Sequence, residues 1–181
     1  MEHIDDFIYK CVYPLSRPQR RNFVRIVKGL IGSVRQTINR ISRFFRGEIT
    51  QSSLNRFIVN SKWTPLQIAV AKIIAFINDD DWYVLIVDDT IIMKFGKLLQ
   101  GASYNKSHIN SSFEFSRCVV SCGLKNLRTG EYFSLLDLLY ISEKDSEKLN
   151  EKFKTKLEIA NFFVDFCIEQ GIKLRSVIFD S

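Results

Sequence analysis

The six residues Trp82–Val87 are all apolar, and five of them are β-branched or aromatic; this run limits the fold more than any other feature of the sequence. A continuous apolar run of this length predicts a central strand buried on both faces, because a half-exposed strand alternates apolar with polar residues. The run stops abruptly at Asp88-Asp89-Thr90, so we expect the strand to end at Val87. The chain is therefore expected to contain a sheet.

The residues after this strand predict the rest of one domain, over residues 81–181. Two further strands are expected at Phe113–Leu124 and Tyr132–Ile141, joined by a turn that ends on a glycine. A single long helix over residues 143–170 then leads to a short buried strand at Ser176–Phe179. This order is strand–strand–strand–helix–strand. The helix is expected to return the chain parallel to the first strand by a right-handed crossover.

Residues 1–80 are expected to form an α-helical bundle. Ser16 is placed to cap a helix that runs to Gly32, and Ser33 to cap a second one that stops at Gly47. A third short helix follows Thr50, and Thr64-Pro65 begins a fourth that reaches Ile77. The sequence thus predicts an α+β or α/β chain with a helical first part.

The positive charge of the chain is concentrated in this helical part. The net charge is +6, and residues 10–72 hold thirteen Lys and Arg against one acid, whereas residues 82–181 hold thirteen of each sign. Such asymmetry favours a module that binds a polyanion such as DNA beside a neutral one, although a solubilising basic surface is the alternative. The candidate nucleic-acid contacts are Arg20, Arg21, Arg25, Arg35, Arg40 and Arg43.

Composition excludes several other classes of protein. With 46% hydrophobic and 25% charged residues the chain is not disordered, and it has no apolar run of the length that a membrane span needs. The four cysteines lack the spacing of a zinc site, so we expect small buried thiols in a reducing cytosol.

Two aspartates follow the first and last expected strands. Asp88 and Asp180 would meet at the carboxyl ends of neighbouring parallel strands, the edge at which open sheets bind ligands. Two carboxylates so close repel each other unless they are protonated or bridged by a cation, and Mg²⁺ or Mn²⁺ suits such oxygen ligands. The alternative is that an aspartate at a strand end is ordinary turn chemistry.

Three parts of the chain together resemble the DDE-type transposases of bacterial insertion sequences. Val87-Asp88-Asp89-Thr90, followed by Lys94 and Gly96-Lys97, is similar to the first-aspartate motif of that family. The residues from Val177 to Ser181 look like its second-aspartate motif, and the arginine-bearing helices resemble its DNA-binding region.

The resemblance implies a ribonuclease-H-like domain that cleaves and joins DNA by metal-assisted phosphoryl transfer. The metals, Mg²⁺ or Mn²⁺, would be held by Asp88 and Asp180, with Asp89 as the alternate to Asp88, and by a glutamate. Lys94 and Lys97 would steer the DNA backbone, or else form an ordinary exposed loop. The implied partners are double-stranded DNA at element ends and a second copy of the chain, in the cytoplasm with the nucleoid, without membrane or small-molecule cofactor.

The resemblance also predicts an incomplete catalytic core. The family's glutamate lies well downstream of the second aspartate, whereas this sequence ends one residue after Asp180. We therefore expect a truncated, catalytically inactive portion of a transposase. One alternative is a protein that only binds DNA and inhibits the full-length enzyme. Another is a ribonuclease-H-like nuclease that acts on other nucleic acids.

Overall fold

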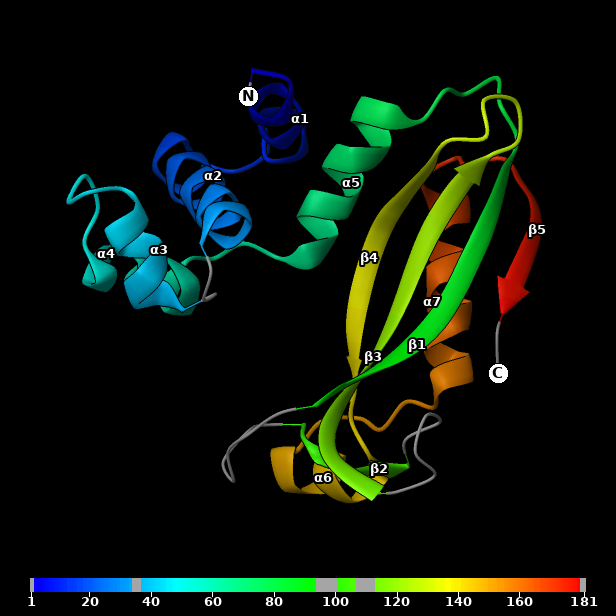
Figure 1. Cartoon of the computed structure of the whole chain (residues 1–181). Helices are drawn as coiled ribbons and strands as arrows, with labels where there is room; N and C mark the ends of the chain where they lie inside the picture. The colour runs from blue at the N-terminus through cyan, green and yellow to red at the C-terminus, as the bar shows by residue number, and fades with distance from the viewer. Residues whose placement is uncertain (1, 34–36, 94–100, 107–112, 180–181) are drawn as a thin grey trace. The chain divides into compact units, whose positions relative to one another are not determined.

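The computed structural model describes residues 2–33, 37–93, 101–106 and 113–179. The chain forms two compact units, residues 1–76 and residues 77–181, so the division falls a few residues before the boundary expected from the sequence. Within the described residues there are seven helices and a mixed, open sheet of five strands (Figure 1). The protein is thus of the mixed α and β class. No helix in this part of the chain is both long and apolar enough to cross a membrane.

The first unit is helical. Its elements are α1 (Glu2–Cys11), α2 (Arg17–Gly32), α3 (Ile38–Phe44), α4 (Gln51–Asn60) and α5 (Pro65–Phe76). Helix α2 begins as expected, with the backbone N–H of Ser16 donating to Gln19 Oε1 at 3.0 Å. The hydroxyl of Thr50 accepts from the backbone N–H of Ser53 at 3.2 Å and caps α4. The four expected helices are therefore present, together with α1, which the sequence analysis did not anticipate.

Two small hydrophobic clusters hold these helices together. The larger joins α1, α2 and α5 through Val12, Val24 and Ile68, and the smaller surrounds Ile41 and Leu54. Gly29 of α2 lies so close to the Ile41 side chain that a Cβ at position 29 would collide with it. The expected helix from Ser33 to Gly47 is shorter than predicted. Its described part, α3, begins after Thr37, whose hydroxyl accepts from the Arg40 N–H at 3.3 Å.

The second unit is built on a sheet. Its elements are β1 (Tyr83–Met93), β2 (Ser103–Lys106), β3 (Phe113–Asn126), β4 (Tyr132–Tyr140), α6 (Glu143–Leu149), α7 (Lys156–Glu169) and β5 (Leu174–Phe179). Strand β1 is central. It pairs antiparallel with β3 on one side and parallel with β5 on the other, while β2 and β4 both pair with β3. The antiparallel pairing of β1 with β3 and of β3 with β4, and the parallel return of β5 beside β1, agree with the expected strand pairing, whereas the short strand β2 was not expected.

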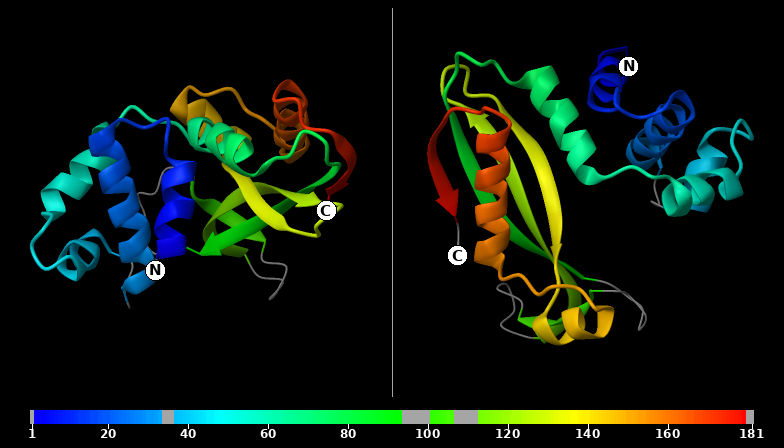
Figure 2. Two further views of the ribbon diagram at one scale, coloured as in Figure 1. Left: turned by 90° about the horizontal axis from the view of Figure 1, so that it is seen from above. Right: turned by 180° about the vertical axis from the view of Figure 1, so that it is seen from behind.

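Helix α7 packs against one face of this sheet (Figures 1 and 2). Phe163 of α7 is fully buried there, and Leu85 and Val87 of β1 are fully buried as well. The left-handed conformation of Gly171, at φ +76°, follows the end of α7 and turns the chain into β5. This arrangement fixes β5 beside β1.

Three expectations for the second unit are wrong. Strand β1 does not end at Val87 but continues to Met93, because the long strand β3 supplies pairing partners for every residue. The helix expected over residues 143–170 is interrupted between α6 and α7, where Asn150 has a left-handed φ of +53°. Strand β5 is exposed rather than buried, because it is an edge strand with a neighbour on one side.

Candidate functional site

Asp88 and Asp89 lie within β1, and their side chains point to opposite faces of the sheet. They pair with Ser121 and Val120 of β3, so both belong to the regular ladder. Because successive side chains of a strand alternate between faces, Asp89 shares the face of the fully buried Val87, and Asp88 lies on the other. Accordingly, Asp88 is exposed and Asp89 is mostly buried. The two carboxylates therefore have different surroundings.

The carboxylate of Asp89 is already engaged inside the protein. Its Oδ2 lies 2.7 Å from Nζ of Lys156, the first residue of α7, and accepts a hydrogen bond from Cys118 Sγ at 3.6 Å. Burial is the largest single influence on the pKa of Lys156 and lowers it, but the hydrogen bond to Asp89 and the interactions with Cys118 and the Asp89 charge together hold this pKa above its ordinary value. Burial raises the pKa of the Cys118 thiol, which stays protonated and can donate. Asp89 thus joins α7 to the sheet.

Asp88 has no such partner among the described residues. Its neighbour across the parallel ladder would come from β5, and that ladder is described up to the pair Val87–Phe179. Val87 directly precedes Asp88 in the sequence, and Phe179 directly precedes Asp180. Asp180 itself lies outside the described residues. The described pairing therefore stops one residue short of both aspartates predicted to bind metal.

The donor chemistry of Asp88 fits a hard divalent cation. An exposed carboxylate without a cationic partner offers two oxygen atoms, the ligand type that Mg²⁺ and Mn²⁺ prefer. Among the described residues, no group of three His, Cys, Asp or Glu side chains is placed to hold a metal ion. The predicted metal site at Asp88 and Asp180 therefore stays a prediction.

No protein-family model matches the chain, and no curated protein matches it.

The predicted nucleic-acid contacts fall into three groups. Arg20 and Arg21 lie at the start of α2, and the exposed Arg40 and Arg43 lie on α3. Arg25 differs from these, because its side chain is largely buried and approaches Glu48, with 3.8 Å between Nη2 and Oε2. Arg35, Lys94 and Lys97 lie outside the described residues.

Sequence reasoning missed two residues beside Arg20 and Arg21. Tyr9 of α1 and Arg17 of α2 line a pocket of about 550 Å³ together with these two arginines. The signal was present in the sequence as three arginines within five positions, from Arg17 to Arg21. Tyr9 lay on a helix that the sequence analysis did not anticipate.

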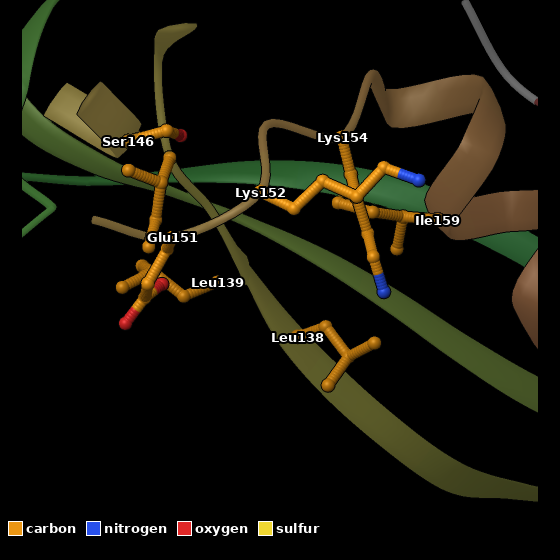
Figure 3. Close-up of a pocket in the computed structure, with 8 residues that line it drawn as sticks. Leu138, Leu139, Ser146, Glu151, Lys152, Lys154 and Ile159 are labelled. Atoms are coloured by element: carbon orange, nitrogen blue, oxygen red, sulfur yellow. The ribbon is translucent and has the colours of Figure 1, made fainter. Parts of the chain in front are cut away.

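A second cavity, of about 210 Å³, lies between β4 and the segment that joins α6 to α7 (Figure 3). Leu138, Leu139 and Ile159 provide apolar walls, and Lys152 and Lys154 cross its rim. Nζ of Lys154 lies over the ring of Phe162, 5.6 Å from its centroid. Both lysines belong to the break between α6 and α7. Asp88 does not line this cavity.

A buried polar network fixes the start of β1. Asp81 accepts hydrogen bonds from Arg128 Nε at 2.6 Å and from Asn126 Nδ2 at 2.8 Å, and Asn126 also donates to the Tyr83 hydroxyl at 3.3 Å. The hydrogen bond from Arg128 is the main cause, and that from Asn126 the next, of a lowered pKa of Asp81. This network ties the β3–β4 turn to the strand that carries Asp88.

Proposed function

We propose that the chain is a DNA transposase of the DDE type, whose second unit is ribonuclease-H-like and whose first unit binds DNA. The observation that carries the proposal is the parallel pairing of β1 with β5, which is described up to the residue before each of the two aspartates. Strands β1, β3 and β4 pair antiparallel in turn, and helices then lead to β5, which is parallel to β1; this arrangement supports the same proposal. It matches the order that the resemblance implies, with the short strand β2 as an addition.

The alternation of side chains along β1 supports Asp88 rather than Asp89 as the metal ligand. Side chains of paired residues on neighbouring strands project to the same face of a sheet, so the pairing Val87–Phe179 favours Asp88 as the partner of Asp180. Asp89 is neutralised by Lys156, and a carboxylate held by an ammonium group is a poor metal ligand. A divalent ion bound by these aspartates would supply Lewis-acid stabilisation and an activated oxygen nucleophile for phosphoryl transfer.

The first unit supports DNA as the substrate. Its segment from residue 10 to residue 72 holds thirteen Lys and Arg against one acid. Neutralising DNA phosphates releases counterions, so we expect affinity for duplex DNA to fall steeply and linearly on a log–log plot against salt concentration. A binding isotherm measured at several salt concentrations checks this.

Metal binding tests the proposed site directly. Mn²⁺ is titrated into the full chain, and bound Mn²⁺ is followed by electron paramagnetic resonance in the wild type, Asp88→Asn and Asp89→Asn. We expect Asp88→Asn to weaken binding at least tenfold and Asp89→Asn to retain it, since Asp89 pairs with Lys156. Equal affinity in the wild type and Asp88→Asn would refute the assignment of the metal site.

A binding-only role is the second candidate. It is favoured by the absence, among the described side chains, of any cluster of three potential ligands. This role predicts that the chain shifts duplex DNA in a gel but does not nick it with Mg²⁺ or Mn²⁺. Metal-dependent nicking that Asp88→Asn abolishes would instead support catalysis by this chain. Nicking that survives Asp88→Asn would contradict both candidates.

A further inference from the structure

The pocket between α1 and α2 combines positive charge with an aromatic ring. Its volume is about 550 Å³, and it is lined by Tyr9, Arg17, Arg20 and Arg21. Sites for small organic ligands have volumes of about 300–1,000 Å³, so one nucleotide unit fits within it. The ring of Tyr9 is 50% exposed and is available for contact.

The three arginines of the pocket have no acidic partner in the described part of the chain. The acids of this unit whose side chains are described are used elsewhere: Asp5 pairs with Lys28 at 2.6 Å, Asp6 pairs with Lys10 at 3.0 Å, and Glu48 approaches Arg25. Helix α2 also has no acid in its first turn, where the helix dipole adds further positive charge. Three guanidinium groups gathered here repel one another unless an anion enters the pocket.

One of the arginines is held in position by the backbone. Nε of Arg20 donates to the carbonyl oxygen of Leu15 at 2.6 Å, which fixes the plane of its guanidinium group. The terminal nitrogens remain available, and a guanidinium fork matches two oxygens of a phosphate. An orientation fixed before binding lowers the entropy cost of holding an anion.

We propose that this pocket binds one nucleotide unit of a DNA strand, its phosphate held by Arg17, Arg20 and Arg21 and its sugar packed against Tyr9. The exposed Arg40 and Arg43 of the same unit extend the positive charge beyond the pocket, which favours a polymeric anion over a small one. The inference rests on the proposed function for the choice of DNA. It adds that binding has a defined anchor and is not spread evenly over the basic surface.

Matched double variants of the full chain test the anchor. Arg17→Gln/Arg21→Gln removes two charges from the pocket, and Arg56→Gln/Lys62→Gln removes two exposed charges that do not line it. Fluorescence anisotropy with a labelled duplex gives the affinity at several salt concentrations, and circular dichroism checks that each variant is folded. We expect the pocket variant to lose at least tenfold in affinity, as charge-assisted hydrogen bonds require, and the control about threefold.

Tyr9 and Tyr13 provide a second matched pair, because they are 50% and 44% exposed and only Tyr9 lines the pocket. Tyr9→Leu is expected to weaken DNA binding by about fivefold to tenfold, the lower part of the range for contacts between an aromatic side chain and a nucleotide. Tyr13→Leu is expected to leave the affinity within about twofold of the wild type. If both members of either pair lost the same affinity for DNA, the pocket would not be the anchor, although the protein would still bind DNA.

A small probe distinguishes failure of the proposed DNA binding from failure of the proposed pocket. If the wild type binds no duplex, the proposed function fails, and calorimetry with a 5′-phosphorylated thymidine dinucleotide then tests the pocket alone. Binding of the dinucleotide that Arg17→Gln/Arg21→Gln abolishes supports the pocket, and absence of binding overturns it. Inorganic phosphate bound as tightly as the dinucleotide would show a site for a small anion and would refute the contact with the sugar.

Discussion

Replacing each of the two adjacent aspartates of β1 by asparagine is expected to give opposite results for stability and metal binding. Asp89 pairs with Lys156 at 2.7 Å, and their side chains are 15% and 37% exposed respectively. Breaking a fully buried pair by removing one partner costs about 3–5 kcal/mol, whereas exposed pairs contribute about 0–1 kcal/mol. With solvent screening on the lysine side, we expect Asp89→Asn to lower the free energy of unfolding by about 1–2 kcal/mol.

Asp88→Asn is the matched control, with the same chemical change one residue away. Asp88 is exposed, and no described residue pairs with it, so we expect a change within about 0.5 kcal/mol. Urea unfolding of the second unit is followed by Trp82 fluorescence in a Trp63→Phe background, because Trp63 belongs to the other unit. Equal losses of unfolding free energy in the two variants, or a larger loss in Asp88→Asn, would refute the placement of Asp89 on the face that α7 covers and of Asp88 on the opposite face.

Three further expectations concern the second unit. The hydrogen bonds from Arg128 and Asn126 lower the pKa of Asp81 below its ordinary value of 3.8. Their stabilisation is therefore present above this pH and is lost as the pH falls through the lowered pKa. Asp81→Asn should flatten the acid limb of a curve of unfolding free energy against pH. The Thr155 hydroxyl caps α7 by accepting from the Glu158 N–H at 3.1 Å. Thr155→Ala removes this cap and should lower the free energy of unfolding, measured in urea, by about 1 kcal/mol. Burial raises the pKa of the Cys167 thiol to about 12, so at pH 8 iodoacetamide should label it only after urea is added.

Most of the strands of the second unit were predictable because they depend on local pattern, but the short strand β2 was missed. The run Trp82–Val87 and the glycine turn between β3 and β4 are short-range signals, and the structure contains the corresponding strands. The end of β1 was not predictable in the same way. Asp88, Asp89 and Thr90 disfavour a strand locally, and pairing with a strand distant in the sequence overrides that preference.

The sequence contained a capping pattern for the break between α6 and α7, but the apolar spacing outweighed it in the prediction. Leu149, Phe153 and Leu157 have the spacing of one continuous helix, and this spacing predicted a single element. Thr155 and Glu158 form a capping box, with the Thr155 N–H donating to Glu158 Oε2 at 2.7 Å. The capping pattern gives the true start of α7, so it should have taken precedence over the apolar spacing.

The candidate site was predictable only in part, for a geometric reason. Asp88 and Asp89 are the same residue type, so their sequence does not distinguish them. The face of the sheet on which each lies depends on the register of β1 against its neighbours. The partner of Asp89, Lys156, lies 67 positions away and comes close only when α7 packs on the sheet. No local sequence pattern contains that contact, so the sequence favoured Asp88 only through its place directly after the apolar run and through the family resemblance.

The charge distribution explains why the two units need each other in the proposed function. Residues 82–181 hold thirteen bases and thirteen acids, so this part exerts no net long-range attraction on DNA. An edge that carries carboxylates repels phosphates until a divalent cation neutralises it. In the proposed function, the attraction that brings DNA to the protein therefore comes from the helical unit, where Arg17, Arg20 and Arg21 are gathered with no acidic partner among the described residues. Substitutions in that unit should accordingly lower the slope of affinity against salt, whereas Asp88→Asn should leave the slope unchanged.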